Sequence, residues 1–279
     1  MPYKINKRFI KELPEGEKHY GTVEELGEYL YRGQSGACAL CQDEMIKAAE
    51  APAEAMVVDH DLPEIRGGKI ELSNIQLVHN VCNSVKSDLT TSEVKPYCRF
   101  RRHLMKLKGS PQYGDVLKHF DIKLSRTEVD IKPNTMIWVF GDKSKEHSKI
   151  SIDSSVHREK THRFTYVEIP KNTLWNDEEV QPRSIYDKQI RDIFHDLIQN
   201  PLHEPPSCRL SEKDSDGLRK ILMFDGQHKT ICYWLHGNEK IVVKVYLDIT
   251  RDEATYLVNS VQSKIGKLKL SVFELASKM

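Results

Sequence analysis

Two pairs of potential metal ligands constrain the fold of this chain more than any other feature of its sequence. Cys38 and Cys41 are separated by two residues, and so are His79 and Cys82. Three thiolates and one imidazole at this spacing suit the closed tetrahedral site of a structural zinc, which leaves no coordination position open. We therefore predict that these residues bind a Zn²⁺ ion that supports folding rather than chemistry. The alternative is that the four side chains only pack against one another.

The segment that joins and follows these pairs is expected to form two short strands and a helix. Residues 56–58 are apolar and predict a strand, the Gly67-Gly68 pair turns the chain, and residues 72–78 predict a second strand. From residue 82 to about residue 90 the pattern starts a helix. This order predicts a ββα arrangement around one site.

The polar residues of this segment fit the hydrolysis of a phosphodiester. His60 is the natural general base for water, because the unperturbed pKa of histidine lies near neutrality. Asp59 and Asn83 offer oxygen atoms, which suit a hard divalent ion such as Mg²⁺ or Mn²⁺ bridging the phosphate and the leaving oxygen. A histidine that is merely structural is the alternative for His60. Asn74 is expected to orient the His60 loop by hydrogen bonds. Lys86 or Arg66 is expected to contact the phosphate.

Together these motifs resemble the HNH endonuclease family, in which a strand ends in Asp-His, a glycine-containing loop follows, and an asparagine and a zinc knuckle complete the site. His79 stands where many members have cysteine, which keeps a zinc ligand. The last motif position is Asn83 rather than histidine, as in the HNH domain of RNA-guided CRISPR nucleases, where an asparagine binds metal. The resemblance implies a metal-dependent nuclease. It spans roughly residues 20–90 and rests on Cys38, Cys41, Asp59, His60, Gly67, Gly68, Asn74, His79, Cys82, Asn83 and Lys86.

Composition indicates a soluble protein without a membrane span. The 279 residues are enough for two domains, 30% of them are charged, and no run of about 18 apolar residues occurs. The N-terminal segment has no apolar core of the signal-peptide type, so we expect a cytoplasmic protein. In that compartment the six cysteines are expected to be reduced or to bind metal.

Charge and strand patterns predict where the chain divides. Between residues 86 and 126 ten lysines and arginines face four acidic residues, which is typical either of a surface that binds a polyanion or of a solvated helix face. Residues 127–169 instead carry strand-like runs separated by polar turns. We therefore expect an α+β protein with a nuclease domain and basic helical extension at 1–125 and a second domain at 126–279.

The second domain carries a motif of its own. A buried strand at residues 220–224 runs directly into the segment DGQHK and then into a helix, and a strand, turn and helix N-terminus can hold a phosphate. The alternative is that the aspartate only caps the helix. The residues expected to sense a nucleotide or DNA are Asp225, Gly226, Gln227, His228 and Lys229.

This motif, with VQPR upstream at 180–183 and residues 257–271 downstream, resembles the DGQHR branch of the ParB/sulfiredoxin-like superfamily, with Lys229 in place of the usual arginine. The resemblance covers roughly residue 169 to the C-terminus and implies a mixed α/β domain that binds or hydrolyses a nucleoside triphosphate. The chain ends soon after the motif, so this domain is expected to be either truncated or minimal.

Three functions follow from the two resemblances. The first is a metal-dependent DNA endonuclease controlled by the DGQHK domain, in a prokaryotic defence or restriction role. The second is a DNA or nucleotide sensor whose HNH site is silent. The third gives the C-terminal domain the chemistry, as a nucleoside-triphosphate hydrolase that switches the nuclease. Because HNH nucleases cut one strand per site, a homodimer is expected for a double-strand break.

Overall fold

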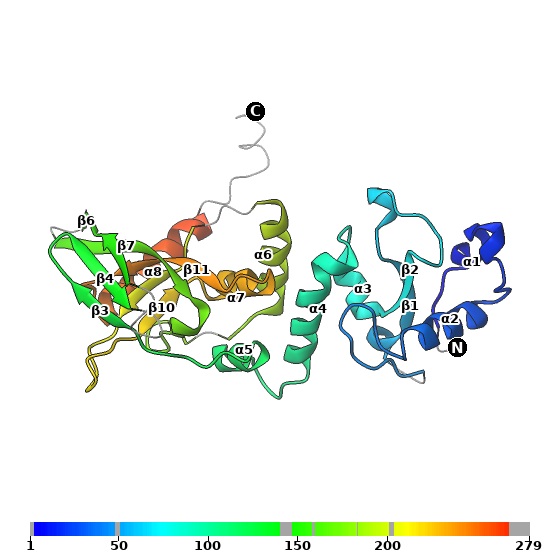
Figure 1. Ribbon diagram of the computed structural model, residues 1–279, viewed down its shortest axis with the longest axis horizontal. Helices are drawn as coiled ribbons and strands as arrows, with labels where there is room; N and C mark the ends of the chain where they lie inside the picture. The colour runs from blue at the N-terminus through cyan, green and yellow to red at the C-terminus, as the bar shows by residue number, and fades with distance from the viewer. Residues whose placement is uncertain are drawn as a thin grey trace, which may run out of the picture. The chain divides into compact units, whose positions relative to one another are not determined.

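The computed structural model describes residues 3–47, 51–139, 147–157, 160–182, 184–200 and 204–267. It divides into two compact units, Met1–Gly109 and Ser110–Met279, which are treated separately (Figure 1). The division between the units, after Gly109, comes earlier in the chain than the domain boundary expected between residues 125 and 126. The domain assignment from the sequence stays a prediction. Arg183 of the VQPR segment and residues 268–279 lie outside the described residues. In the described part of the chain, no helix is long and apolar enough to cross a membrane.

The first unit is built on one antiparallel hairpin covered by short helices. Strands β1 (Met56–His60) and β2 (Ile75–His79) pair so that Asp59 lies opposite Gln76 and His60 opposite Ile75. Helix α3 (Asn80–Lys86) follows β2 without a loop and packs against both strands. The expected ββα arrangement is therefore present. The other α-helices in the described part of this unit are α1 (Arg8–Glu12), α2 (Val23–Gly33) and α4 (Thr91–Met105).

Local sequence signals fix where the longer helices of this unit begin. Helices α2 and α4 both start at a threonine whose hydroxyl accepts a hydrogen bond from the backbone of a glutamate three residues later. Each glutamate side chain accepts a hydrogen bond from the backbone of its threonine in return, which forms a complete capping box. The pairs are Thr22 with Glu25, and Thr90 with Glu93. The second box fixes the start of α4 beside the hairpin.

The second unit combines a small antiparallel sheet with a larger mixed sheet. The small sheet has the order β3-β4-β5, and the large one the order β6-β7-β11-β9-β10-β8. Strand β10 runs parallel to β8, and β11 parallel to β9, whereas the other pairs are antiparallel. The strands are β3 (Glu128–Ile131), β4 (Thr135–Val139), β5 (His147–Ser151), β6 (Asp153–His157), β7 (Lys160–Pro170), β8 (Leu174–Asn176), β9 (Ser207–Leu210), β10 (Ile221–Asp225) and β11 (Lys240–Tyr246).

Four α-helices lie in the described part of this unit, and one of them, α7 (Gln227–Leu235), begins within the DGQHK motif. Helix α6 (Asp187–Gln199) buries an apolar stripe against α7, which follows β10 directly. On α8 (Arg251–Lys267), Ala254 and Val258 pack against Phe224 of β10. Helix α5 (Tyr113–His119) joins the unit through Tyr113, whose hydroxyl donates to the carbonyl of Leu174. The chain is thus α+β, as expected from the sequence.

Candidate functional site

The four potential zinc ligands of the first unit come together in its interior. One donor atom from each of Cys38, Cys41, His79 and Cys82 can be chosen so that all lie within 4.8 Å of one another, and all four residues are buried. His79 is the last residue of β2, and Cys82 lies in the first turn of α3. Three thiols and an imidazole at this separation form the donor set that tetrahedral zinc requires. The cluster is therefore compatible with the expected zinc knuckle.

Proton sharing within the cluster also fits a cation site. Hydrogen bonds from Cys41 and Cys82 lower the pKa of the Cys38 thiol far below its usual range, whereas the hydrogen bonds with Cys38 raise the pKa values of the other two thiols. Burial opposes the charge on His79, yet hydrogen bonds to Cys38 and Cys41 raise its pKa to about 10. The pKa values of these four side chains depend on one another because the side chains lie close together. A divalent cation would bind all four as thiolates and a neutral imidazole, and would offset the repulsion between the thiolates.

Glu54 supports this cluster from outside, and the sequence analysis did not identify it. The Nδ1 atom of His79 lies 3.4 Å from the Cys41 sulfur, while its Nε2 atom lies 3.6 Å from the Glu54 carboxylate. Arg102 donates to both carboxylate oxygens of Glu54, at 2.6 and 2.8 Å, and to Asp43 at 2.7 Å. A carboxylate behind a metal-binding histidine fixes the tautomer and orientation of the imidazole. Arg102, one of the ten lysines and arginines between residues 86 and 126, thus has a structural role.

Asp59 and His60 lie at the end of β1, where Lys86 of α3 meets them from inside the unit. Lys86 is 1% exposed, its Nζ atom donates to the backbone oxygen of His60 at 2.7 Å, and the same atom lies 3.2 Å from the Asp59 carboxylate. Gln76, opposite Asp59 in the hairpin, donates to the same carboxylate oxygen at 3.3 Å. The buried ammonium therefore holds the carboxylate and the strand end in one arrangement.

His60 itself is half-buried and poised in its neutral form. Its Nε2 atom is buried and has no hydrogen-bond partner among the described residues. The ring of Phe9 from α1 lies 5.0 Å from the imidazole, centroid to centroid. Burial lowers the pKa of His60 below 6.5, against the opposing effects of Glu64 and Asp59. A neutral imidazole with an unpaired nitrogen can accept a proton at neutral pH.

Asn74 ties the loop after His60 to the start of β2. Its side-chain oxygen accepts from the backbone of Leu62 at 2.8 Å, and its amide nitrogen donates to the carbonyls of Leu62 and Lys69 at 3.1 and 2.9 Å. Gly68 allows this closure, because a Cβ atom there would lie 1.7 Å from the Leu62 oxygen and 2.9 Å from the Asn74 amide. The hydrogen bonds expected of Asn74 are thus present in the loop.

Of the two remaining residues of the predicted site, Asn83 lies on α3 and Arg66 lies within this loop. Asn83 is half-buried and sits three positions before Lys86 in α3, so the two share a helix face. Arg66 pairs with Glu93 of α4 at 2.5 Å and donates to the Asp88 carbonyl at 3.4 Å. Arg66 therefore joins the loop to the start of α4, and its side chain is 41% exposed.

In the second unit, the DGQHK segment forms the junction of β10 and α7. Gly226 adopts a left-handed backbone with φ of +96°, and a Cβ atom there would lie 2.9 Å from Pro206. The Nε2 atom of His228 accepts from the backbone of Tyr186, and the Lys229 ammonium donates to the carbonyl of Glu204 at 2.5 Å. Both side chains thus contact neighbouring backbone segments.

Three buried or half-buried amide side chains lie beside this junction. Gln227, 1% exposed, donates to the side-chain oxygen of Asn176 at 3.4 Å, and Asn176 donates to the backbone oxygen of Gln181 at 3.5 Å. The side-chain oxygens of Gln181 and Gln227 are buried without a hydrogen-bond partner among the described residues. Close by, Arg209 pairs with the buried carboxylate of Asp177 at 2.5 Å. The sequence analysis identified only Gln227 of this group as a candidate ligand-binding residue.

A family model described as HNH endonuclease matches residues 38–89. The matched segment contains the ligand cluster, the hairpin and α3, so the resemblance seen in the sequence is confirmed for this part of the chain. The match to this family supports a nuclease activity. No curated protein matches the chain.

Similar solved structures include sulfiredoxin from Arabidopsis thaliana, with 19% identity and a TM-score of 0.24 over 30% of this chain and 86% of that one. They also include the C-terminally truncated chromosome-partitioning protein ParB from Caulobacter crescentus, complexed with CTP-gamma-S. That match has 14% identity and a TM-score of 0.32, and it covers 40% of this chain and 59% of the ParB chain. Structural similarity with TM-scores this low does not assign an activity to the chain.

Proposed function

We propose that the first unit is a metal-dependent DNA endonuclease whose general base is His60. The observation that carries the proposal is the buried, unpartnered Nε2 atom of an imidazole whose pKa is lowered by burial, at the end of a strand within the matched HNH segment. A neutral imidazole in this position can take a proton from the attacking water. Asn74 keeps the loop that carries this imidazole in place.

Asp59 and Asn83 are the residues that would hold the catalytic Mg²⁺ or Mn²⁺. A carboxylate oxygen and an amide oxygen are hard donors of the kind these ions prefer. When bound, such an ion supplies charge neutralisation at the phosphate and at the departing oxygen. Asp59 is held at the strand end by Lys86 and Gln76, so its carboxylate needs little reorganisation.

Lys86 and Arg66, the two candidate phosphate contacts, are proposed to have different roles. Lys86 would have to leave a hydrogen bond of 2.7 Å in the interior to reach a phosphate, so we assign it the positioning of Asp59 and His60. Arg66 is 41% exposed and could exchange Glu93 for a phosphate at low cost, because exposed ion pairs are worth about 0–1 kcal/mol.

Nicking of supercoiled plasmid tests this function. The wild-type protein is expected to convert the plasmid to open circles when Mg²⁺ or Mn²⁺ is present. His60→Ala is expected to abolish conversion while keeping its zinc, and His103→Ala, in the last turn of α4, serves as the matched control and is expected to cut normally. A protein that binds DNA but does not cut it with any divalent ion would instead support the silent-site alternative.

For the second unit we propose a nucleotide-binding role that controls the nuclease, in a prokaryotic defence or restriction system. The supporting observation is the pair of buried amide oxygens of Gln181 and Gln227 that lack partners beside the N-terminus of α7. Groups of this kind accept hydrogen bonds from amino or hydroxyl groups of a ligand. Titration with nucleoside triphosphates, with Gln227→Leu as comparison, tests binding. Phosphate release that is lost in Asp225→Asn would add a hydrolase activity to this unit.

A further inference from the structure

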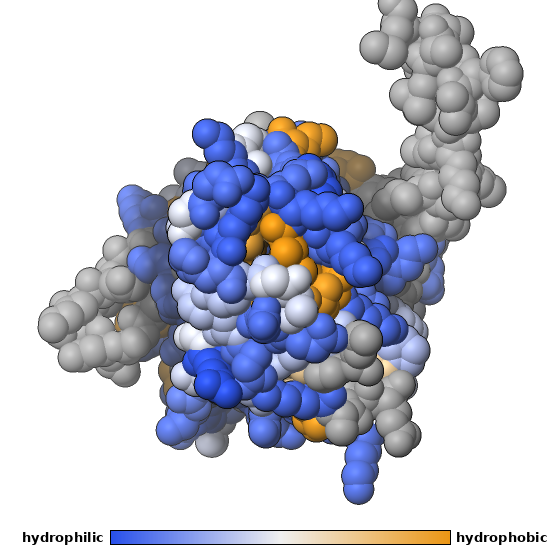
Figure 2. All heavy atoms as spheres, turned by 90° about the vertical axis from the view of Figure 1, so that its right-hand side faces the viewer, coloured by the Kyte–Doolittle hydropathy of each residue, from blue (hydrophilic) through white to orange (hydrophobic). Residues whose placement is uncertain are grey.

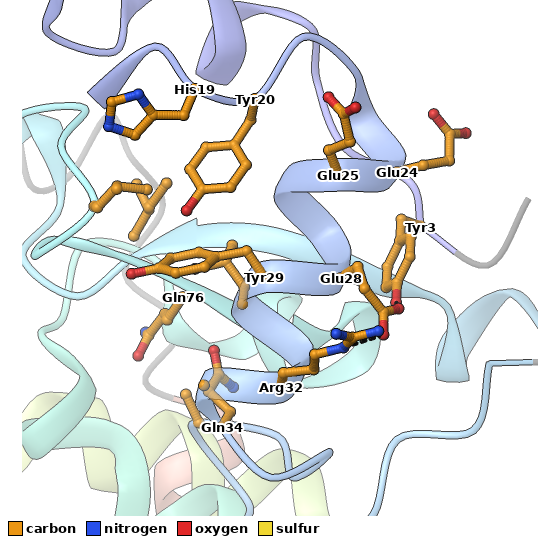
Figure 3. Close-up of a pocket in the computed structure, with 15 residues that line it drawn as sticks. Tyr3, His19, Tyr20, Glu24, Glu25, Glu28, Tyr29, Arg32, Gln34 and Gln76 are labelled. Atoms are coloured by element: carbon orange, nitrogen blue, oxygen red, sulfur yellow. Dashed lines mark hydrogen bonds and ion pairs between the residues drawn. The ribbon is translucent and has the colours of Figure 1, made fainter. Parts of the chain in front are cut away.

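The first unit has an open cleft beside α2 that none of the proposed catalytic residues occupies. Its volume is about 1230 Å³, and it lies between α2, the segment that precedes it, and β2 (Figure 3). Viewed from the α1–α2 end, the surface of this unit exposes apolar atoms between hydrophilic side chains (Figure 2). Its lining includes His19, Tyr20, Glu24, Tyr29, Arg32 and Gln76.

Aromatic rings form the wall of this cleft. The rings of Tyr20 and Tyr29 lie 4.9 Å apart and are inclined by 37°, and the His19 ring lies 6.3 Å from Tyr20 (Figure 3). Tyr29 remains 46% exposed, so part of its ring faces solvent. Exposed aromatic rings in a concave site form a platform on which a planar group can stack, and nucleic-acid bases are the usual partners of such platforms.

The charges of the cleft favour a base over a phosphate. Glutamates 24, 25 and 28 line it, and among the described lining residues Arg32 is the sole lysine or arginine. Arg32 is already paired with Glu28 at 2.8 Å. Lys47 also pairs with Glu28, at 2.6 Å. Neither Glu24 nor Glu25 pairs with a cation among the described residues, so a phosphate would meet the negative charge of these two carboxylates. The edge of a base carries amino groups that donate hydrogen bonds, and carboxylate oxygens accept them.

Gln76 connects the cleft to the proposed catalytic residues. It lines the cleft and also donates to the Asp59 carboxylate. Its neighbour Ile75, also in the lining, lies directly opposite His60 in the hairpin. Directly opposed residues of antiparallel strands have Cα atoms about 4.5–5.5 Å apart. The cleft is therefore lined by a residue of β2 whose direct partner on the adjacent strand β1 is the proposed general base.

We propose that this cleft holds one unpaired nucleobase of the DNA strand that is cut, stacked on Tyr29. The inference rests on the proposed nuclease function of the same unit. A base inside a duplex cannot enter the cleft without leaving its stack, and that costs least where the base is already unpaired. The protein consequently prefers DNA with an unpaired base beside the cut over fully paired DNA.

Binding measurements with three matched probes test the proposal. The probes are a fully paired duplex, the same duplex with one unpaired 2-aminopurine, and the same duplex with an abasic residue at that position, all measured with the His60→Ala protein so that no probe is cut. The His60→Ala protein, whose cleft is unchanged, is expected to bind the 2-aminopurine probe most tightly and to quench its fluorescence. Tyr29→Ala should weaken that binding about 5- to 150-fold and leave the abasic probe unaffected, because stacking on one aromatic ring is lost.

Two comparisons separate stacking from other causes. Tyr29→Phe keeps the ring and should bind like the parent protein, and Tyr166→Ala, an equally exposed tyrosine of the second unit, should do the same. The salt dependence of binding should not change in Tyr29→Ala, because no phosphate contact is removed. Equal loss on the abasic probe, a reduced salt slope, or no preference among the probes would overturn the proposal. A preference for the unpaired base in a protein that never cuts would leave the cleft assignment intact and refute the nuclease function.

Discussion

Replacing Lys86 by methionine separates a positioning role from a phosphate contact. Methionine keeps the apolar stem of the side chain but removes the ammonium that contacts the His60 carbonyl at 2.7 Å and the Asp59 carboxylate at 3.2 Å. The change removes the cationic partner of the largely buried Asp59 carboxylate, which keeps its hydrogen bond from Gln76, and removes this donor from the His60 carbonyl. If Lys86 is a positioning residue, the folded state of the first unit therefore loses stability.

The expected loss follows from the burial of both partners. Removing one member of a buried ion pair costs about 3–5 kcal/mol. The Asp59 side chain is 14% exposed and can recruit water, so we expect a somewhat smaller loss, about 2–4 kcal/mol. For a unit of this size such a loss lowers Tm by roughly 10–30 °C.

The distribution of tryptophan makes this loss measurable in one unit at a time. All three tryptophans, Trp138, Trp175 and Trp234, lie in the second unit, so their fluorescence reports its unfolding. Zinc release in urea, followed with a chromogenic chelator, reports the first unit. Lys86→Met should shift the zinc-release midpoint and leave the tryptophan transition in place. An unchanged midpoint, combined with a salt slope of DNA binding reduced by about one, would refute the positioning role and favour a phosphate contact.

Three other changes have defined outcomes. Because burial lowers the pKa of His60, the neutral base persists below pH 6.5, and the cleavage rate should fall only when the pH drops below that value, which a pH–rate profile measures. Glu54→Gln should weaken zinc affinity about 10- to 100-fold in a competition titration with a chelator, and unchanged affinity would exclude a role behind His79. Gly68→Ala should destabilise the first unit by about 1–3 kcal/mol in the zinc-release assay, since its Cβ atom would overlap the Leu62 carbonyl; an equally stable variant would show that the loop can relax.

Features encoded over short stretches of sequence could be predicted. The two ligand pairs, the strand that leads into Asp59 and the helix that contains Cys82 are each set by residues close together in the chain. All of them are present in the structure, although the helix runs from Asn80 to Lys86 and ends before the expected residue 90. The capping box at Thr22 is predictable for the same reason. Local patterns therefore sufficed for the ββα arrangement and for the α+β class.

Contacts between distant segments could not be predicted in this way. A lysine three residues after Asn83 gives no sign that it will be buried against Asp59, and nothing in the sequence around Phe9 indicates that its ring will lie on His60. Glu54 lies in a segment with weak structural signals, so its place behind His79 emerges only from the fold. The sequence shows which residue types are present, whereas their pairing depends on tertiary packing.

The cleavage rate of the His60→Ala protein relative to wild type tests the nuclease assignment most directly. Both proteins would be mixed with supercoiled plasmid and Mg²⁺, and the appearance of open circles would be followed over time after their zinc content has been matched. Loss of a general base is expected to slow cutting by about 10²- to 10⁴-fold. Equal rates for the two proteins would contradict the assignment of His60 as the catalytic base.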